Sequence, residues 1–459
     1  MKGRIAGAGR AAALGAALLG STLLALSAVA QSWPGVWGPE RNARLPGPLE
    51  VPTNPQLEEI WRHPVGKGYS EIAVASGRGF LTFSDGERDH LAALDLDTGK
   101  EIWRRPLGET YRGHDGSDDG PIATPVLEDG RVVVLDPFGR LYAFGAEDGQ
   151  ALWTRDLAKD FGGSAPYWGY ASSPLPVDIG DQRALVVQTG AQEASSLVAL
   201  TAGTGETLWT AHPAPGNGYS SPVLMQLAGE EQIVAATSEK VFAVRSEDGA
   251  VLWSHEVPGE PRRSPVAIPQ DRVLVSSWNE TALLSVRRTG KADGGWQVTE
   301  LWAKPVLKGT YSPAVYHQGH LYGMNGTYLV CVDPQQGDVL WRHKLYHATV
   351  LLVEDKLWVL GERSGRLYLV EATPERYRQL LEAQVFNPGA RSMTGPVMVS
   401  GRLLLRNLEE RVQLRLVSSA NEPPPGDSGG TEAERGPSDD DQESDPPEDR
   451  NQPADEAER

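Results

Sequence analysis

LDLDTGKEIW, residues 94–103, is one copy of a phrase that returns four more times along the chain. In every copy an apolar segment is followed by a turn with glycine at a fixed place and by a second segment that ends on tryptophan. The other copies are FGAEDGQALW (144–153), LTAGTGETLW (200–209), VRSEDGAVLW (244–253) and VDPQQGDVLW (332–341). Glycine suits a hairpin turn that needs a positive φ, which residues with side chains resist. Each copy therefore predicts a β-hairpin.

Two further predicted strands precede each copy, as in ATPVLEDGRVVVLDPFGRLYAF (123–144) and SPAVYHQGHLYGMNGTYLVCV (312–332). Such strand sets begin near residues 69, 122, 172, 220, 264, 312, 349 and 396, which makes eight. Four short antiparallel strands in roughly 45 residues are typical of one blade of a β-propeller. The sequence therefore predicts an all-β, eight-bladed β-propeller of four-stranded antiparallel blades.

The two ends of the repeat region complement each other. GPVMVSGRLLLRNLEERVQLRLV (395–417) supplies three strands without a closing tryptophan strand, whereas QLEEIWRHP (56–64) is such a strand with nothing before it. We expect the N-terminal strand to complete the last blade and close the ring, because closure removes exposed strand edges. The seventh unit departs from the pattern: TPERYRQLLEAQVF (373–386) suggests a short helical excursion in place of the tryptophan strand.

The propeller is predicted over residues 57–417. Residues 1–30 have the pattern of a secretory signal peptide, with Lys2, Arg4 and Arg10 ahead of an apolar run and small residues at the cleavage position. Residues 31–56 are predicted to be an extended N-terminal segment. Residues 418–459 are predicted to be a disordered acidic tail, which carries most of the formal net charge of −18. The single cysteine, Cys331, excludes an internal disulfide.

The repeated phrase resembles the A-L-D-x-x-T-G-x-x-x-W repeat of the quinoprotein-like propeller family, and the similarity extends over about residues 57–417. WPGVWGPERNARLPG (33–47), WGYASSPL (168–175) and LYLVEATPERY (367–377) look like segments of secreted bacterial PQQ-like repeat proteins. Two better-known relatives are the BamB-type outer-membrane assembly scaffold and the alcohol dehydrogenases that depend on pyrroloquinoline quinone (PQQ). The resemblance implies that the following tryptophans dock between blades: Trp61, Trp103, Trp153, Trp209, Trp253, Trp302 and Trp341.

The loops that enter the inner strands define the candidate site. In a propeller these loops arrive at one face near the central channel, and binding residues concentrate on such loops. The candidate channel-face residues are Arg112, His114, Tyr167, Trp168, Tyr219, Arg262, Arg263, Tyr311, His347 and Arg391. Four tyrosines recur at equivalent places just before a serine, so packing and ligand contact both stay open for Tyr69, Tyr170, Tyr219 and Tyr311. The three arginines from Arg262 onward break the repeat and favour an anionic or peptide partner.

A PQQ enzyme would need oxygen ligands converging on Ca²⁺, a carboxylate base and, by the resemblance, usually an adjacent Cys-Cys pair. One cysteine cannot form that pair. RGHDGSDDGP (112–121) and SWNETAL (277–283) are the nearest candidate loops, and both are typical of ordinary turns. We therefore expect no catalytic residue, no metal ligand and no bound cofactor, and we keep PQQ with Ca²⁺ as the alternative.

These observations favour a periplasmic or secreted, non-catalytic binding or scaffold module that acts through its channel face. Its partner would be an envelope protein, a peptide or a small molecule. The alternative is a PQQ- and Ca²⁺-dependent dehydrogenase-like protein, or another small-molecule enzyme, with its pocket on the same face. The absence of a Lys/Arg-rich stripe argues against nucleic acid. We expect a monomer with no membrane span in its mature chain.

Overall fold

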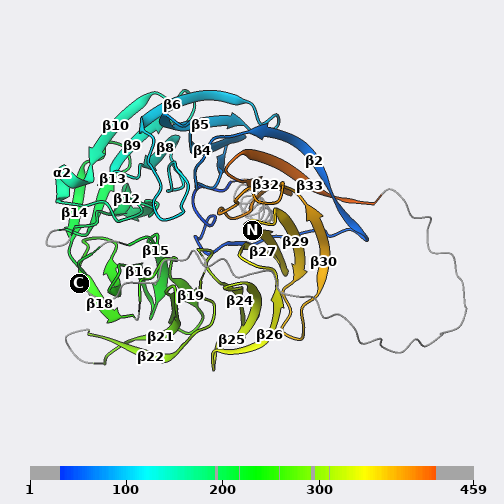
Figure 1. Cartoon of the computed structure of the whole chain (residues 1–459). Coiled ribbons are helices and arrows are strands. Elements are labelled where there is room, and N and C mark those ends of the chain that lie inside the picture. Colours follow the sequence, from blue (N-terminus) through cyan, green and yellow to red (C-terminus); the bar gives the residue numbers. More distant parts are fainter. Residues whose placement is uncertain are drawn as a thin grey trace, which may run out of the picture.

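The computed structural model describes residues 32–419, apart from 192–194, 217, 258, 291–294 and 310. Eight β-sheets are arranged around one centre as the blades of a closed ring (Figure 1). Each blade has four antiparallel strands, so the predicted eight-bladed propeller is confirmed. The predicted signal peptide and nearly all of the predicted acidic tail lie outside the described residues. No helix in the described part of the chain is long and apolar enough to cross a membrane.

Blades are numbered along the chain. Within each blade the strands are given from the innermost to the outermost. Blade 1 is β3 (Ala73–Ala75), β4 (Arg78–Ser84), β5 (Arg88–Asp95) and β6 (Glu101–Glu109); blade 2 is β7 (Val126–Glu128), β8 (Arg131–Leu135), β9 (Arg140–Gly145) and β10 (Ala151–Asp156), followed by the one-turn helix α2 (Leu157–Phe161). Blade 3 is β11 (Leu175–Ile179), β12 (Gln182–Gln188), β13 (Leu197–Thr201) and β14 (Thr207–Ala211); blade 4 is β15 (Val223–Leu227), β16 (Glu230–Ala236), β17 (Lys240–Arg245) and β18 (Val251–Glu256).

The second half of the ring repeats this order. Blade 5 is β19 (Val266–Ile268), β20 (Arg272–Ser276), β21 (Thr281–Arg288) and β22 (Trp296–Lys304); blade 6 is β23 (Val315–His317), β24 (His320–Asn325), β25 (Tyr328–Asp333) and β26 (Asp338–Lys344). Blade 7 is β27 (Ala348–Val353), β28 (Lys356–Gly361), β29 (Arg366–Glu371) and β30 (Gln379–Gln384); blade 8 is β31 (Val397–Val399), β32 (Arg402–Arg406), β33 (Glu410–Ser418) and β2 (Pro55–Pro64).

The ring closes in blade 8, where the N-terminal strand β2 pairs with the last strand, β33, as the sequence predicts. The pairing is antiparallel and runs from Pro55 opposite Ser418 to Pro64 opposite Glu410. Blade 7 corrects the other expectation for this region. The predicted helical excursion is wrong, because residues 379–384 form the outer strand β30 against β29. The extra residues form an irregular loop between these two strands.

The tryptophan that ends the repeated phrase lies between neighbouring blades. Trp209 Nε1 donates to Ser246 O in the turn of the next blade at 2.9 Å, and its ring lies over Gly249 of the same turn. A Cβ at Gly249, whose φ is +71°, would stand 2.6 Å from that ring. Glycine is therefore required both by the turn and by the indole above it. The same pairing joins Trp61 to Gly99, Trp103 to Gly149, Trp153 to Gly205 and Trp302 to Gly337.

Two tryptophans depart from this arrangement where the next blade lacks the glycine turn. Blade 5 has a longer β21–β22 connection, and Trp253 donates instead to Gln232 Oε1 of its own blade at 2.7 Å. Trp341 donates to Thr373 O of blade 7 at 2.8 Å, and Tyr377 packs edge-on against it with ring centroids 6.0 Å apart. The partner of each tryptophan thus follows from the turn that its neighbour supplies.

The segment before β2 folds into the centre of the ring, which the sequence did not predict. In Figure 1 this dark blue stretch lies in the middle of the blades. Trp33 forms an isolated bridge with Val74 of β3, and the two-residue strand β1 (Arg44–Leu45) pairs in parallel with β27 on blade 7. Trp33 is fully buried. The chain's own N-terminal segment therefore crosses the channel from blade 1 to blade 7.

Arg41 holds this segment to the opposite side of the channel. Its Nη1 donates to Ser173 O and Pro222 O, each at 3.1 Å, and its Nη2 donates to Pro174 O. The residue is 4% exposed, and burial lowers its pKa to about 9, so it stays protonated at neutral pH. A buried guanidinium that donates to three carbonyls joins the segment to blades 3 and 4.

A run of backbone-to-hydroxyl hydrogen bonds connects the starts of the inner strands. Glu71 N donates to Thr124 Oγ1 at 3.0 Å, Thr124 N to Ser173 Oγ at 3.0 Å, and Ser173 N to Ser221 Oγ at 2.9 Å. Each of the three hydroxyls thus receives a bond from the preceding blade. Blade 1 carries Glu71 where blades 2 to 4 carry a hydroxyl. The acid is a departure from the repeat at the wall of the channel.

Candidate binding site at the channel face

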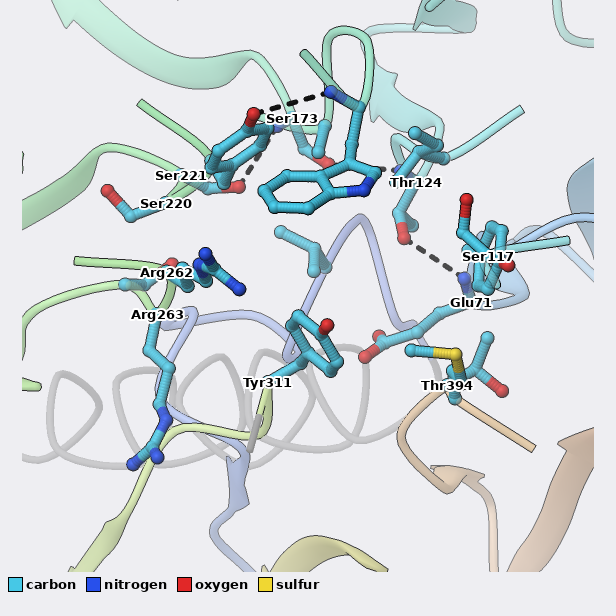
Figure 2. A pocket seen from close by; sticks show the side chains of 18 of the residues that line it. Glu71, Ser117, Thr124, Ser173, Ser220, Ser221, Arg262, Arg263, Tyr311 and Thr394 are labelled. Carbon is cyan, nitrogen blue, oxygen red and sulfur yellow. Dashed lines mark hydrogen bonds between the residues drawn. The ribbon is translucent and has the colours of Figure 1, made fainter. Parts of the chain in front are cut away.

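A cavity of about 280 Å³ lies where the loops that enter the inner strands converge (Figure 2). Val36 and Trp37 of the N-terminal segment form part of its wall, so the cavity is built partly on the segment that crosses the channel. Its other lining residues come from the entry loops of blades 1 to 6 and 8. A largely apolar hollow with a few convergent polar groups is the usual form of a small-molecule site.

Aromatic rings form much of the wall. Trp168 packs against Tyr219 with ring centroids 5.7 Å apart, and the Tyr219 hydroxyl accepts from Trp168 N at 3.3 Å. The Arg262 guanidinium lies over the Trp168 ring at 4.8 Å and over the Trp278 ring at 5.1 Å. Its Nε and Nη2 donate to Glu260 Oε2 at 3.2 and 3.1 Å. Stacking and the ion pair together fix the orientation of this guanidinium.

The loop at residues 110–121 contributes Tyr111 and residues 115–118 to the cavity wall and is held by ion pairs. Asp118 pairs with Lys67 at 3.2 Å and with Arg391 at 3.3 Å, and Arg391 also pairs with Glu362 at 3.2 Å. Tyr69 accepts from Asp118 N. Burial raises the pKa of Tyr69 to about 12, so its hydroxyl stays protonated. Arg391 therefore ties this loop to the entry loop of blade 8 and to blade 7.

Glu71 is the most deeply buried acid of the cavity wall, with 3% of the residue exposed. Trp33 Nε1 and Trp37 N both donate to its Oε2 at 3.0 Å. Its Oε1 is buried and makes no hydrogen bond of normal geometry with the described residues. Burial raises the pKa of Glu71 to about 8, against the lowering effect of the N–H groups of Trp33, Trp37 and Gly395. The carboxyl is therefore largely protonated at pH 7.

Six of the ten predicted channel-face residues line the cavity: Trp168, Tyr219, Arg262, Arg263, Tyr311 and Arg391. Arg263 differs from the rest because its guanidinium points away from the hollow in Figure 2 and donates to Leu307 O. Tyr170, which the repeat pattern also favours as architectural, is 3% exposed and donates to Thr189 O at 2.6 Å. Trp168 and Tyr170, only two residues apart, therefore have different roles: Trp168 lines the cavity, and Tyr170 packs inside the propeller.

The other four predicted residues lie outside the cavity lining. Arg112 pairs with Asp119 at 2.7 Å within the loop at residues 110–121. His114 packs against Tyr167, whose hydroxyl donates to Asp115 Oδ2 at 2.9 Å. Tyr167 is 59% exposed. His347 accepts a backbone hydrogen bond from Glu362 N at 2.8 Å. These residues lie on the loop face around the cavity.

Sequence reasoning missed Glu71 and the contribution of the N-terminal segment. Glu71 had a usable signal, because an acid stands where the next three blades place Thr124, Ser173 and Ser221 before a proline. Trp37 had no comparable signal. It comes from outside the repeats, and only the folded ring brings it beside Glu71, where a Cβ on Gly395 would meet the Trp37 ring at 2.6 Å and Glu71 Oε1 at 2.8 Å.

The blades and the docked tryptophans define the class of protein: a PQQ-like-repeat β-propeller with a cavity at its channel face. A family model described as "Outer membrane protein assembly factor BamB" matches residues 87–342, more than half of the chain. The chain belongs to this BamB-like family. Its relationship to individual BamB proteins is distant, at 22–25% identity, and its likeness to quinohemoprotein dehydrogenase structures is one of fold.

Three individual comparisons show how similar the chain is to known proteins. The chain is 26% identical over 239 residues to the tetrathionate hydrolase of Acidithiobacillus ferrooxidans, a match that covers 48% of this chain and only 44% of that protein. It is 25% identical over 324 residues to the outer membrane protein assembly factor BamB of Burkholderia pseudomallei, covering 70% of this chain and 68% of that protein. The quinohemoprotein alcohol dehydrogenase structure from Comamonas testosteroni superposes with a TM-score of 0.60 at 13% identity, covering 89% of this chain and 84% of the other, which shows the shared fold.

The described residues of the cavity wall do not offer the oxygen donors that the Ca²⁺ of a PQQ–Ca²⁺ pair requires. Ca²⁺ takes six to eight oxygen ligands. Among the described residues no group of three or more His, Cys, Asp or Glu side chains could hold a metal ion. The three acids of the wall are separately engaged: Glu71 accepts from Trp33 and Trp37, Asp115 from Tyr167, and Asp118 pairs with Lys67 and Arg391.

Proposed function

We propose that this protein is a non-catalytic binding or scaffold module of the bacterial envelope, periplasmic or secreted, which holds its partner at the channel face. The observation that carries the proposal is the cavity itself. It is an aromatic-walled hollow whose charged groups are fixed by neighbours, with no convergent set of metal ligands among the described residues. The partner would be an envelope protein, a peptide or a small molecule.

Relatives and residue chemistry support this proposal from two directions. BamB relatives are named as outer membrane protein assembly factors, which supports an envelope location and a protein partner. The exposed loop face around the cavity carries Tyr167, Tyr311 and Arg112, and such aromatic and arginine side chains are enriched in protein interfaces. The proposal also holds that no PQQ is bound and that the chain is monomeric.

The test is capture of partners from the native envelope by the tagged full-length protein, with and without crosslinking. The double variant Trp168→Ala/Arg262→Ala should lose a partner that the wild type retains. Arg378→Ala is the matched control, because Arg378 is also ion-paired, with Glu371 at 3.0 Å, but lies at the other end of the strands, in the loop before β30. Equal capture by all three proteins would refute binding at the channel face.

A second candidate is an enzyme that uses the same cavity. The similarity to a tetrathionate hydrolase and the raised pKa of Glu71 favour it, since perturbed acids in clefts are frequent in active sites. Two assays decide. One follows loss of tetrathionate, and the other adds PQQ and Ca²⁺ and measures quinone absorbance with dye-linked alcohol oxidation. Turnover by the wild type that is lost in Glu71→Gln would refute the non-catalytic proposal and support an enzyme.

A further inference from the structure

A carboxyl group and a guanidinium group face each other across the cavity. In Figure 2 the Glu71 carboxyl and the Arg262 guanidinium point into the same hollow from opposite sides, and Tyr311 lies below the space between them. Glu71 comes from the entry loop of blade 1, and Arg262 comes from the loop that enters blade 5. The ring therefore juxtaposes an acid and a base that lie far apart in the propeller sequence.

The Glu71 carboxyl has binding capacity that the protein leaves unused. Trp33 and Trp37 both donate to Oε2, whereas the buried Oε1 makes no hydrogen bond of normal geometry with the described residues and has the Gly395 N–H beside it. Glu71 makes no salt bridge within the described part of the chain. Rotation about the last side-chain bond of Glu is soft, so either oxygen can be presented to the cavity. A ligand ammonium group would supply further donors, and its positive charge would favour the ionised form of the Glu71 carboxyl.

The Arg262 guanidinium has capacity left as well. Glu260 occupies Nε and Nη2 with one oxygen, and the hydroxyls of Tyr311 and Tyr219 are further polar neighbours. A guanidinium carries five N–H groups, so donors remain for a ligand carboxylate. Arg391, another arginine on the cavity wall, pairs with Asp118 and Glu362 and donates to Gly116 O. Arg262 is therefore the better anchor for an anion.

The wall beside the Glu71 carboxyl and the Arg262 guanidinium suits a flat apolar side chain. Trp168 and Tyr311 line the hollow, and the Trp168 ring is already held by Tyr219 and Arg262. The nearby hydroxyls of Thr124, Ser173 and Ser221 accept backbone hydrogen bonds between blades and are less available for recognition. Specificity therefore falls to the carboxyl, the guanidinium and the rings.

We propose that the channel-face cavity binds a small zwitterion with a flat apolar body, an aromatic α-amino acid or a short peptide carrying one, with its ammonium group at Glu71 and its carboxylate at Arg262. The inference rests on the proposed function as a binding module, and names the ligand class of that same cavity. An amine alone would leave Arg262 without a ligand anion, and an acid alone would leave Glu71 without a cation. Only the zwitterion uses both sides.

The test is isothermal titration calorimetry on the full chain with three matched probes: L-phenylalanine, phenethylamine, which lacks the carboxylate, and 3-phenylpropionate, which lacks the ammonium. Phenylalanine should bind about tenfold or more tightly than either analogue, because each analogue forfeits one charge-assisted contact. Glycyl-phenylalanine distinguishes a peptide from a free amino acid. Binding of the dipeptide alone, weakened by both Glu71→Gln and Arg262→Gln, supports the peptide form of the proposal.

Variants assign each end of the ligand. Glu71→Gln should weaken phenylalanine about tenfold and leave 3-phenylpropionate unchanged, and Arg262→Gln should weaken phenylalanine and 3-phenylpropionate and spare phenethylamine. Arg378→Gln is the control and should change nothing. At pH 6.5 binding should also release a proton, because an ammonium beside Glu71 lowers the raised pKa of that carboxyl. Titrations in buffers of different ionisation enthalpy measure this release, which Glu71→Gln should abolish.

Equal affinity for the three aromatic probes, or no binding of any probe to folded protein, overturns the zwitterion assignment. The proposed function is tested separately: it fails if partner capture is equal in the wild type, the channel-face double variant and the control. A protein that captures its partner but ignores every probe would retain the scaffold role and lose only this ligand class.

Discussion

Replacing Gly249 by alanine should destabilise the propeller through two separable effects. The first is conformational, since Gly249 has a φ of +71°, where a Cβ costs about 1 kcal/mol or slightly more. The second is steric: the new Cβ would lie 2.6 Å from Cε3 of the Trp209 ring in the neighbouring blade. Overpacking of this kind costs about 1–3 kcal/mol. The expected loss in the free energy of unfolding is therefore about 2–4 kcal/mol.

Gly229 provides the matched control because it has only the first of these effects. Its φ is +79°, and a Cβ added there would meet no atom within 4 Å beyond its immediate chain neighbours. Gly229→Ala should therefore cost only about 1 kcal/mol. Urea denaturation followed by tryptophan fluorescence and circular dichroism measures both losses, and the difference between them isolates the contact between blades.

The double variant Gly249→Ala/Trp209→Phe tests the steric half directly. A smaller ring relieves the clash, so the two substitutions should be less than additive by about 1 kcal/mol or more. If Gly249→Ala and Gly229→Ala prove equally destabilising, or if the double variant is strictly additive, the proposed tryptophan-over-glycine contact does not determine blade packing.

The remaining predictions concern the channel. Arg41→Met should lower the free energy of unfolding by about 3 kcal/mol, because three buried carbonyls lose their donor; a urea titration that shows less than about 0.5 kcal/mol would contradict this role of the N-terminal segment. Burial raises the pKa of Glu71 from its ordinary value of 4.5 to about 8, so the folded state binds this proton more tightly than the unfolded state, and stability should fall as the pH rises from about 4.5 through about 8. Glu71→Gln should flatten that decline by about 4 kcal/mol in unfolding measured at pH 5 and pH 9, and an unchanged pH profile would argue against a buried, proton-binding carboxyl. Tyr167→Ala should change stability by less than about 0.5 kcal/mol because the ring is 59% exposed, whereas Trp168→Ala should cost about 1–2 kcal/mol through lost stacking on Tyr219 and Arg262, and the reverse order in thermal unfolding would contradict this assignment.

The candidate site was only partly predictable. Arg262 and Trp168 could be found because they break a repeat that is otherwise regular, and both line the cavity. The same comparison of blades would have found Glu71 at a position that carries a hydroxyl in blades 2 to 4. His347 shows the limit of this reasoning: it lies on an equivalent loop but outside the cavity lining, because loop position alone does not determine where a side chain points.

The repeats in the sequence determine the architecture of the propeller. The glycine and tryptophan of LDLDTGKEIW encode a local turn and a contact with the adjacent blade, so repetition of the phrase specifies the ring and its closure by β2. The course of residues 33–45 through the channel and the approach of Trp37 to Glu71 depend instead on the assembled ring. Those contacts join segments without a shared period. Their partners are defined only when the blades have assembled, because the channel that binds them does not exist in any single repeat.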